Sequence, residues 1–184
     1  MRKLLFTTLI YLFYFLPTTA EVVNKINISG NSRVSNETIK IYGDIKINEN
    51  YTEQDLNRIL NNLFSTNFFE DVQVELSNNI LNIKLIEHPV INQLILIGEP
   101  SNKYKVQIKK LIKSKEKDSY IKNNIANDVE TIKKIYASQG YNFTEVDTKI
   151  KKIDSSNLDL IFEIKKGEQT RISKITFVGD KKIR

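Results

Sequence analysis

The chain has 184 residues, a formal net charge of +6, a single histidine and no cysteine. It therefore has no disulfide staples, no thiol nucleophile and no Cys/His zinc site, and His88 alone gives no support to a Ser-His-Asp triad. The segment Gly98-Glu-Pro100 is not a phosphate loop, because it lacks the glycine pattern and the following Lys-Ser/Thr. These exclusions argue against an enzyme, and we expect no metal or other cofactor.

Residues 1–20 are predicted to be a signal peptide. Two basic residues after Met1 are followed by an apolar run, Leu4 to Leu16, and by the small-residue ending Thr18-Thr-Ala20. The apolar run is shorter than the ~20 residues that a membrane-spanning helix needs, although an uncleaved N-terminal anchor is the alternative. We expect export to remove this segment, so that the mature chain begins near Glu21 and works outside the cytoplasm.

One sequence phrase, in which apolar residues alternate with other residues and end in glycine, occurs three times. It begins at Val23, Ile91 and Ile172, and its glycines at 30, 98 and 179 are 68 and 81 residues apart. A period this long indicates a repeated small domain. We predict four segments: the signal peptide 1–20, a first module 21–90, a second module 91–166, and the first strand of a third, truncated module at 167–184.

The first module begins with a strand and two helices. Ile26 and Ile28 alternate with polar residues, as in a half-buried strand. Ser35 is placed to cap a short helix that Gly43 is expected to end, and Thr52-Glu-Gln-Asp55 resembles a capping box that opens a longer helix. In the second module Leu94 and Leu96 mark the strand, and a first helix is suggested by Val106, Ile108 and Leu111. The stripe of the longer second helix consists of Ile121, Ile125, Val129, Ile132 and Tyr136.

Each module ends in a predicted β-hairpin. In the first, 72–76 and 81–85 alternate with period two around Asn78-Asn79, which suits a tight turn because Asn tolerates positive φ. In the second, the strands are 146–153 and 158–164. A three-stranded sheet with one apolar face needs a cover, which the two helices supply. The predicted fold class is α+β, with tandem β-α-α-β-β modules.

Seven lysines carry much of the positive charge and lie close together in the second module. They are Lys103, Lys105, Lys109, Lys110, Lys113, Lys115 and Lys117. The simplest interpretation is the solvated face of a helix. Contact with an acidic partner or with anionic lipid headgroups is the remaining option, and nucleic acid is not an expected partner of an exported protein.

The order of these elements resembles the POTRA modules of the BamA-type family of outer-membrane barrel-assembly proteins. The resemblance rests on I-x-x-I-x-I-x-G-N-x-R/K-V/I, on L-F-x-T-N-F-F-E-D-V, on the E-x-P joint, and on G-Y-x-x-x-x-V followed by K-G-E-Q-x-R-I-x-K-I-x-F-x-G, which together extend across 21–184. It implies that each module has a mixed sheet. The strand that is second of the three in chain order, which is the first strand of the hairpin, lies at an edge of that sheet.

The resemblance also implies a function. Modules of this family extend into the periplasm from a C-terminal barrel in the outer membrane. They bind nascent outer-membrane β-barrel proteins and accessory assembly lipoproteins. A barrel needs at least ~8 strands, for which this sequence has no room, so we expect a fragment of a longer protein. The alternatives are the arm of a TamA-like or two-partner-secretion translocator, or a cell-division scaffold of the FtsQ type.

A partner that accepts many unfolded strands is expected to use an open sheet edge, because every strand offers the same backbone groups. The candidate binding residues lie in the first strand of each predicted hairpin, which is the middle strand of its module in chain order. They are Val72, Gln73, Val74, Glu75 and Leu76, and Val146, Asp147, Thr148, Lys149 and Ile150. Proline at Gln73 or Thr148 is expected to remove one edge donor. The alternative is that both edges are ordinary strand rims, kept soluble by charged side chains such as Glu75 and Lys149.

Overall fold

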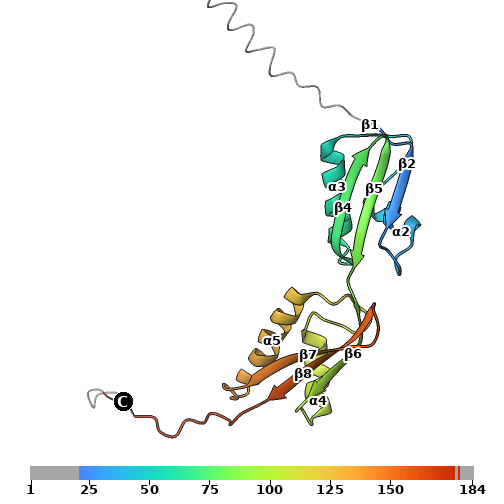
Figure 1. Ribbon diagram of the computed structural model, residues 1–184. Coiled ribbons are helices and arrows are strands. Elements are labelled where there is room, and N and C mark those ends of the chain that lie inside the picture. Colours follow the sequence, from blue (N-terminus) through green and yellow to red (C-terminus); the bar gives the residue numbers. More distant parts are fainter. Residues whose placement is uncertain (1–20, 177, 179–184) are drawn as a thin grey trace, which may run out of the picture. The chain divides into compact units, whose positions relative to one another are not determined.

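The computed structural model describes residues 21–176 and 178, so the predicted signal peptide and the glycine of the third phrase lie outside the described residues. The chain divides between Glu87 and His88 into two compact units. We call the described residues up to Glu87 unit 1 and those from His88 unit 2 (Figure 1). The second strand-helix-helix plan begins at Val90, one residue before the boundary expected from the sequence.

The helices and strands of the two units follow the same order, apart from two short extra strands in unit 1. Unit 1 contains β1 (Glu21–Val22), β2 (Lys25–Ser29), α2 (Asn36–Gly43), β3 (Asn50–Tyr51), α3 (Glu53–Ser65), β4 (Phe69–Ser77) and β5 (Ile80–Glu87). Unit 2 contains β6 (Val90–Ile97), α4 (Asn102–Leu111), α5 (Lys122–Ala137), β7 (Glu145–Lys152) and β8 (Asn157–Lys165). Both predicted hairpins are present. Strands β4, β5 and β8 are longer than predicted, whereas β7 has the predicted length and begins one residue earlier.

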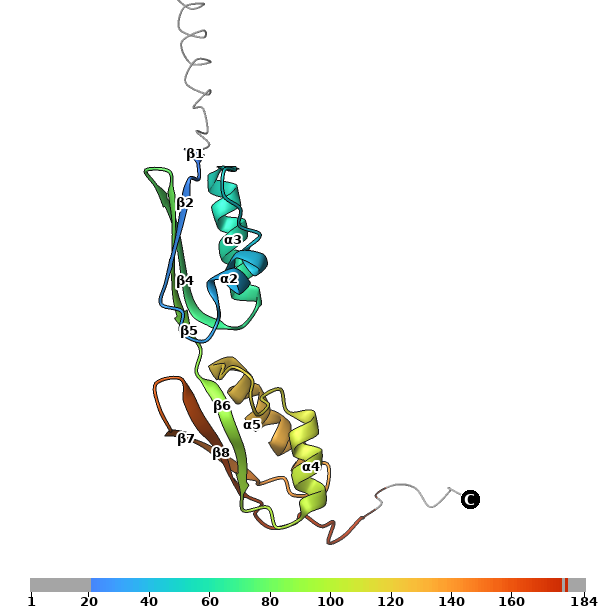
Figure 2. The ribbon, with the colours of Figure 1, turned by 90° about the vertical axis from the view of Figure 1, so that its right-hand side faces the viewer.

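Each unit has a three-stranded mixed sheet. The strand order is β2-β5-β4 in unit 1 and β6-β8-β7 in unit 2, and in each sheet the first pair is parallel and the second antiparallel. Two helices cover one face of each sheet (Figure 2). The predicted α+β fold is therefore confirmed. Strands β4 and β7, the first strands of the two hairpins, lie at a sheet edge, as the family resemblance implied.

Each unit buries its own apolar core between its sheet and its helices. The unit 1 core consists of Val23, Val34, Ile39, Ile45, Tyr51, Ile59, Leu63, Phe69, Val72, Leu81, Ile83 and Leu85. The unit 2 core consists of Ile91, Leu94, Leu96, Ile108, Ile112, Ile125, Ile132, Ile135, Tyr136, Val146, Leu158, Leu160, Phe162 and Ile164. Separate cores indicate that each unit is stabilised mainly by its own apolar residues.

The helix-capping predictions for unit 1 hold with one correction. The Ser35 hydroxyl caps α2 by accepting a hydrogen bond from the Thr38 N–H, and Thr52 and Asp55 form the reciprocal capping box of α3. Gly43, however, does not end α2 in a left-handed conformation. It is the last helical residue, and Asp44 takes the left-handed position with φ of 50°. A Cβ at Gly43 would lie 2.6 Å from the Ile45 Cδ1, so the Ile45 side chain would have to shift.

The first helix expected in the second module is present as α4, and of the three apolar residues that suggested it only Ile108 lies in the core. Ile108 is fully buried, but Val106 is 68% exposed and Leu111 is 53% exposed. Ile112, one helical turn after Ile108, fills the core instead. The stripe predicted for α5 is confirmed in its centre, where Ile132 is fully buried. Val106 and Leu111 therefore lie among the exposed lysines of α4.

Gly30 and Gly98 end the first strand of their units at equivalent places. Their φ angles are +88° and +86°, and a Cβ on either would overlap the carbonyl oxygen of the central strand, at Leu85 or at Ile164. The repeated glycine is required both by the left-handed backbone and by this close approach. It explains why the sequence phrase ends in glycine in both units.

Residues after β8 remain tied to unit 2 for only a short distance. The Thr170 N–H donates to the Gly140 carbonyl at 2.8 Å, and the Gln169 side-chain amide donates to the Gln139 carbonyl at 3.0 Å. No strand is formed over 171–176, where Ile172 is 81% exposed. Among the described residues no strand lies beside 171–176, and a lone strand is not stable in water.

We expect Gly98→Ala to destabilise unit 2 far more than Gly140→Ala. Both glycines have left-handed φ angles, +86° and +89°, but an added Cβ at Gly140 meets nothing closer than 3.3 Å. Alanine at 140 should cost about 1–2 kcal/mol from backbone strain alone. Alanine at 98 must also separate two parallel strands and should cost roughly 3–5 kcal/mol. Urea unfolding of residues 21–184 measures both, and equal losses would contradict the close-approach argument.

Candidate functional site: the outer edges of β4 and β7

The ten residues predicted to bind peptide lie on two sheet edges, one in each unit. Val72 to Leu76 form the centre of β4, and Val146 to Ile150 lie in β7. Both strands pair with a neighbour on one side only among the described residues. The structure therefore provides two separate candidate edges of the same kind.

Side chains alternate across β4 as the sequence predicted. Val72 is buried and Val74 and Leu76 pack partly against the unit 1 core, whereas Gln73 and Glu75 are exposed. The apolar residues thus anchor the strand to the helix-covered side of the sheet. The backbone of the same strand remains available along its outer side.

The turn between β4 and β5 determines which backbone groups point outward. Asn78 and Asn79 have φ angles of 51° and 62°, which defines a two-residue turn of type I′. Such a turn is flanked by a hydrogen-bonded pair, Ser77 and Ile80, and bonded pairs then alternate along the strands. The N–H and C=O groups that face away from β5 consequently belong to Val72, Val74 and Leu76.

A second observation supports this assignment. A Cβ on Gly30 would overlap the Leu85 carbonyl oxygen, so that carbonyl points toward β2 and away from β4. Leu85 lies opposite Val72 in the β4–β5 register. Val72 is therefore in a non-bonded pair, and its own backbone groups point outward.

This geometry corrects one prediction from the sequence. Gln73 lies opposite Lys84 in a hydrogen-bonded pair, so its N–H faces β5 and not the open edge. Proline at Gln73 would break the hairpin instead of blocking the edge. The sequence shows which side chains face the core, but it does not show which backbone N–H groups face the neighbouring strand. That direction depends on the pairing register of β4 and β5, which only the structure gives. Val74 is the central residue of β4 whose N–H is free.

In β7 the same reasoning supports the sequence choice. The Ile153 N–H donates to the Asn157 carbonyl at 3.0 Å, which makes this a bonded pair next to Lys152 and Leu158. Alternation then directs the backbone groups of Thr148 outward. Thr148 is opposite Phe162, and its own side chain is exposed. Proline at Thr148 therefore removes an edge donor without removing a buried side chain.

The inner side of β7 is less covered than expected. Val146 is buried, but Ile150, which lies on the same side of the strand and opposite Leu160, is 45% exposed. The following Ile153 is 50% exposed. A strand added to this edge would therefore find uncovered apolar side chains beside the free backbone groups.

The opposite edge of the unit 2 sheet, at β6, is partly occupied by the chain itself. In unit 2 the Ile91 N–H donates to the Asp118 carbonyl at 2.9 Å, and the Leu94 N–H donates to the Glu116 carboxylate at 3.2 Å. In unit 1 the Val23 N–H donates to the Glu49 carbonyl at 3.0 Å, but Val23 lies before β2 begins at Lys25. No sequence signal indicated these contacts. The contacts on β6 leave β7 as the more open edge of the unit 2 sheet.

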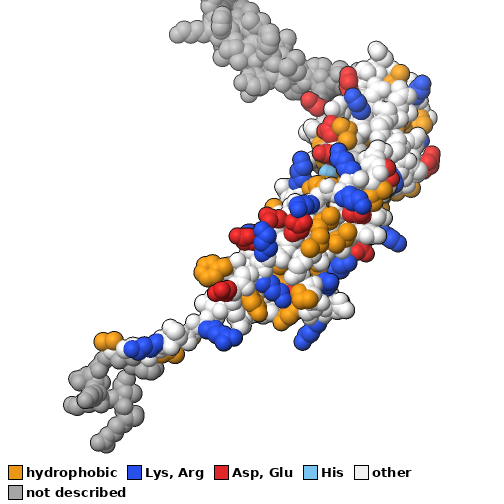
Figure 3. Space-filling view, turned by 60° about the horizontal axis from the view of Figure 1, so that its bottom comes forward, with side chains coloured by type: hydrophobic (Ala, Val, Ile, Leu, Met, Phe, Trp, Pro, Cys, Tyr) orange, Lys and Arg blue, Asp and Glu red, His pale blue; other side chains and the backbone are white. Residues whose placement is uncertain are grey.

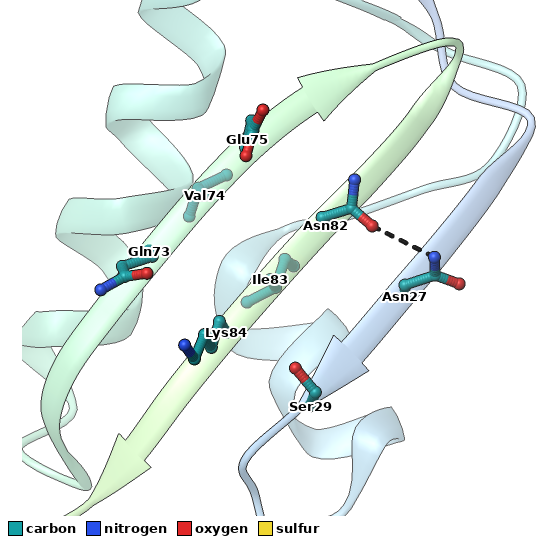
Figure 4. Close-up of a pocket in the computed structure, with 8 residues that line it drawn as sticks. All are labelled: Asn27, Ser29, Gln73, Val74, Glu75, Asn82, Ile83 and Lys84. Atoms are coloured by element: carbon teal, nitrogen blue, oxygen red, sulfur yellow. Dashed lines mark hydrogen bonds between the residues drawn. The ribbon is translucent and has the colours of Figure 1, made fainter.

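A shallow polar hollow of about 430 Å³ lies on the bare face of the unit 1 sheet, beside the β4 edge (Figure 4). It is lined by Asn27, Ser29, Gln73, Val74, Glu75, Asn82, Ile83 and Lys84. The Asn27 side-chain amide donates to the Asn82 side-chain oxygen at 3.1 Å across β2 and β5. The described residues contain no group of three His, Cys, Asp or Glu side chains that could hold a metal ion.

At the end of β5, the buried carboxylate of Glu87 holds the loop that follows β2. It accepts hydrogen bonds from the backbone N–H groups of Ser32, Arg33 and Val34 at 2.9–3.1 Å. Burial raises the pKa of Glu87, but the three N–H donors and the nearby Arg33 charge outweigh burial and lower it. The ionised carboxylate thus fastens the parallel strand pair at its end.

In unit 2 a buried carboxylate has a similar place, directly after β6. Glu99 accepts hydrogen bonds from the Ser101 N–H at 2.7 Å and from the Tyr136 hydroxyl, and it pairs with the Lys166 ammonium at 2.9 Å. Burial raises the pKa of Glu99, while these donors and the Lys166 charge lower it overall. Burial, together with the hydrogen bond to Glu99, raises the pKa of Tyr136.

The Lys166 ammonium also lies over aromatic rings. Their centroids are 5.5–5.8 Å from its Nζ, within the range of cation–π attraction. The rings are those of Tyr104, Tyr136 and Tyr141. Lys166, directly after β8, therefore contacts both helices of unit 2, through Tyr104 of α4 and Tyr136 of α5.

Tandem domains of one α+β plan, each with an open sheet edge, make this chain a repeat protein. A family model described as "Surface antigen variable number repeat", POTRA, matches residues 21–87 and 89–167. The chain belongs to the POTRA family, which confirms the resemblance drawn from the sequence motifs.

Two curated relatives have the same printed name. The chain is 27% identical over 163 residues to the outer membrane protein assembly factor BamA of Neorickettsia risticii (strain Illinois), covering 88% of this chain and 22% of that protein. BamA of Neisseria meningitidis serogroup B (strain ATCC BAA-335 / MC58) is 26% identical over 161 residues, covering 86% and 20%. The chain thus spans about a fifth of the length of these relatives.

Among solved structures, the N-terminal domain of Omp85 from the thermophilic cyanobacterium Thermosynechococcus elongatus is similar. The TM-score is 0.52 at 14% identity, with 82% of this chain and 65% of that chain covered. At this identity the likeness concerns the fold alone. Within the described part of the chain, no helix is long and apolar enough to span a membrane.

We expect acid to weaken unit 1 through Glu87. Its pKa in the folded state lies below the ordinary 4.5, so its contribution is complete above that pH and is lost as the pH falls through the lowered value. Glu87→Gln should cost about 1–3 kcal/mol at pH 7, because the charge-assisted hydrogen bonds are lost, and should leave a smaller further loss at low pH. Urea unfolding at both pH values tests this, with the exposed Glu70→Gln as the control.

Proposed function

We propose that this chain is the periplasmic arm of an outer-membrane protein assembly factor and that it holds nascent outer-membrane β-barrel proteins by strand addition. The observation that carries the proposal is the pair of open edges at β4 and β7, whose outward backbone groups have no partner strand among the described residues. The name of the two relatives, outer membrane protein assembly factor, supports the same role.

Strand addition suits this task because the incoming chains differ in sequence but share one backbone. A bound strand makes its main-chain hydrogen bonds with the edge, and its side chains contribute little selectivity. At β7 the exposed Thr148 and Ile150 would lie beside alternate side chains of the guest strand. The edges therefore fit extended segments of many sequences better than a single folded ligand.

The location and the further partners belong to the same proposal. Export rests on the predicted signal peptide at 1–20, and the periplasmic side of the outer membrane is where nascent barrel proteins arrive. Accessory assembly lipoproteins are the proposed second class of partner. The separate cores of the two units support this arrangement, since one unit can bind while the other docks.

The test combines Val74→Pro with Thr148→Pro, so that one outward donor is removed from each edge. A fluorescent peptide of alternating apolar and polar residues, taken from a barrel strand, is titrated into residues 21–184 and followed by anisotropy. We expect the double variant to remain folded and to bind roughly tenfold more weakly, since each edge loses a hydrogen bond and gains a ring.

Two controls define the result. Thr148→Val changes the same side chain but keeps the N–H, and it should bind as the wild type does. Lys149→Pro removes an N–H that faces β8, and it should disrupt the hairpin, as circular dichroism would report. A folded double-proline variant with unchanged peptide affinity would mean that β4 and β7 are ordinary strand rims.

A further inference from the structure

The two units have opposite net charge. Residues 21–87 contain six Lys or Arg against ten Asp or Glu, whereas 88–166 contain fifteen Lys against ten Asp or Glu and no Arg. The excess in unit 2 is local, because 103–117 contains seven lysines and a single acid, Glu116. A charge difference of this size within one chain indicates that the two units face different surroundings.

Two of the seven lysines are used within the structure. The Lys115 ammonium donates to the carbonyls of Lys110 and Ile112 at 3.2 and 2.6 Å and also to that of Lys109, so it closes the C-terminus of α4. The Lys109 ammonium pairs with Glu116 at 2.8 Å. The others have no carboxylate within ion-pair distance in the described part of the chain.

Three of these free lysines lie on α4 or just after it. Lys103 and Lys110, seven residues apart, follow helical spacing, and Lys113 comes just after the helix ends at Leu111. All three are exposed, while Ile108 is buried in the core. Between these lysines in the sequence are two exposed apolar residues, Val106 and Leu111. We define the α4 lysine face as Lys103, Val106, Lys110, Leu111 and Lys113. Figure 3 shows blue basic and orange apolar side chains next to one another on the surface of this unit.

We propose that the α4 lysine face docks unit 2 onto an anionic lipid surface. Clusters of four to eight basic residues attract anionic headgroups, with about 1 kcal/mol for each residue near the surface. The segment 103–117, which includes the three lysines of this face, contains seven lysines. Val106, 68% exposed, and Leu111, 53% exposed, add short apolar contacts at the depth of the headgroups. Lysine stems reach past these residues and place their charges at the phosphates.

The composition of the face favours lipid over an acidic protein. Carboxylates on a protein partner are recognised best by arginine, whose planar guanidinium binds them with two hydrogen bonds, and 88–166 contains none. Protein interfaces are also anchored by Trp, Tyr or Arg, and this face offers only Val106 and Leu111. Lysines that act as separate point charges suit a fluid array of phosphates instead.

Lipid contact at α4 is compatible with strand addition at β7. Helix α5, and not α4, is the helix that packs against β7 (Figure 1). The α4 lysine face and the open edge are therefore formed by different elements of unit 2. The two activities are independent, so each can be lost without the other.

The experiment measures binding of residues 21–184, which contain both cores, to vesicles by co-sedimentation. Phosphatidylcholine vesicles with phosphatidylglycerol should bind the protein, pure phosphatidylcholine vesicles should not, and added salt should weaken binding. The triple variant K103Q/K110Q/K113Q should bind roughly a hundredfold more weakly. The matched control K134Q/K151Q/K152Q changes three exposed lysines elsewhere in unit 2 and should retain most of the binding.

Three outcomes would overturn the proposal. Equal loss in the two triple variants would mean that binding follows net charge and not the α4 lysine face. Equal binding to both kinds of vesicle would exclude anionic headgroups as the ligand. Binding to polyglutamate without binding to anionic vesicles would identify an acidic protein as the partner. Peptide affinity, measured on the same triple variant, should be unchanged, which separates this test from that of strand addition.

Discussion

The parallel pairing of the first and last strands of each unit is the constraint on which the rest of the fold depends. At Gly30 and Gly98 the chain approaches the central strand so closely that no side chain fits. A parallel pair requires a long crossover, which the two helices provide, and these helices cover one sheet face. The hairpin then places β4 or β7 on the remaining side of the central strand. The open edge is therefore a consequence of the topology.

In both units a charged side chain just after or at the end of the central strand binds groups that follow the first strand. The charged residue is an acid in unit 1 and a lysine in unit 2. Glu87 lies two residues after Leu85 and holds backbone N–H groups of unit 1, whereas Lys166 lies two residues after Ile164 and holds Glu99. In each unit a charge at the end of the central strand is matched by groups that follow the first strand. A side chain of either charge can therefore stabilise the end of the parallel strand pair. The two repeats can share a fold although their residues at these positions differ.

The sequence predicted the elements well because their signals are local. The capping box of Thr52 and the tight turn at Asn78 depend on neighbouring residues alone. The inner side of α4 was harder, because the segment offers more apolar residues than one side can hold, and packing against the sheet selects Ile108 and Ile112. The outward direction of a backbone N–H, as at Gln73, depends on pairing with a distant strand and has no local signal.

An edge that accepts strands is also an edge that invites aggregation, so the chain must keep it open without exposing a flat apolar strip. At β4 this is achieved by packing Val72 and its apolar neighbours inward while Gln73 and Glu75 face water. At β7 the inner side is less covered, yet lysines flank Ile150 on both sides along the strand. Charged neighbours oppose pairing between two copies of β7, because like charges would meet across the new strand pair. A guest strand without that charge pattern would meet no such repulsion, so under the proposed function the lysines that protect the edge would also distinguish guest from self.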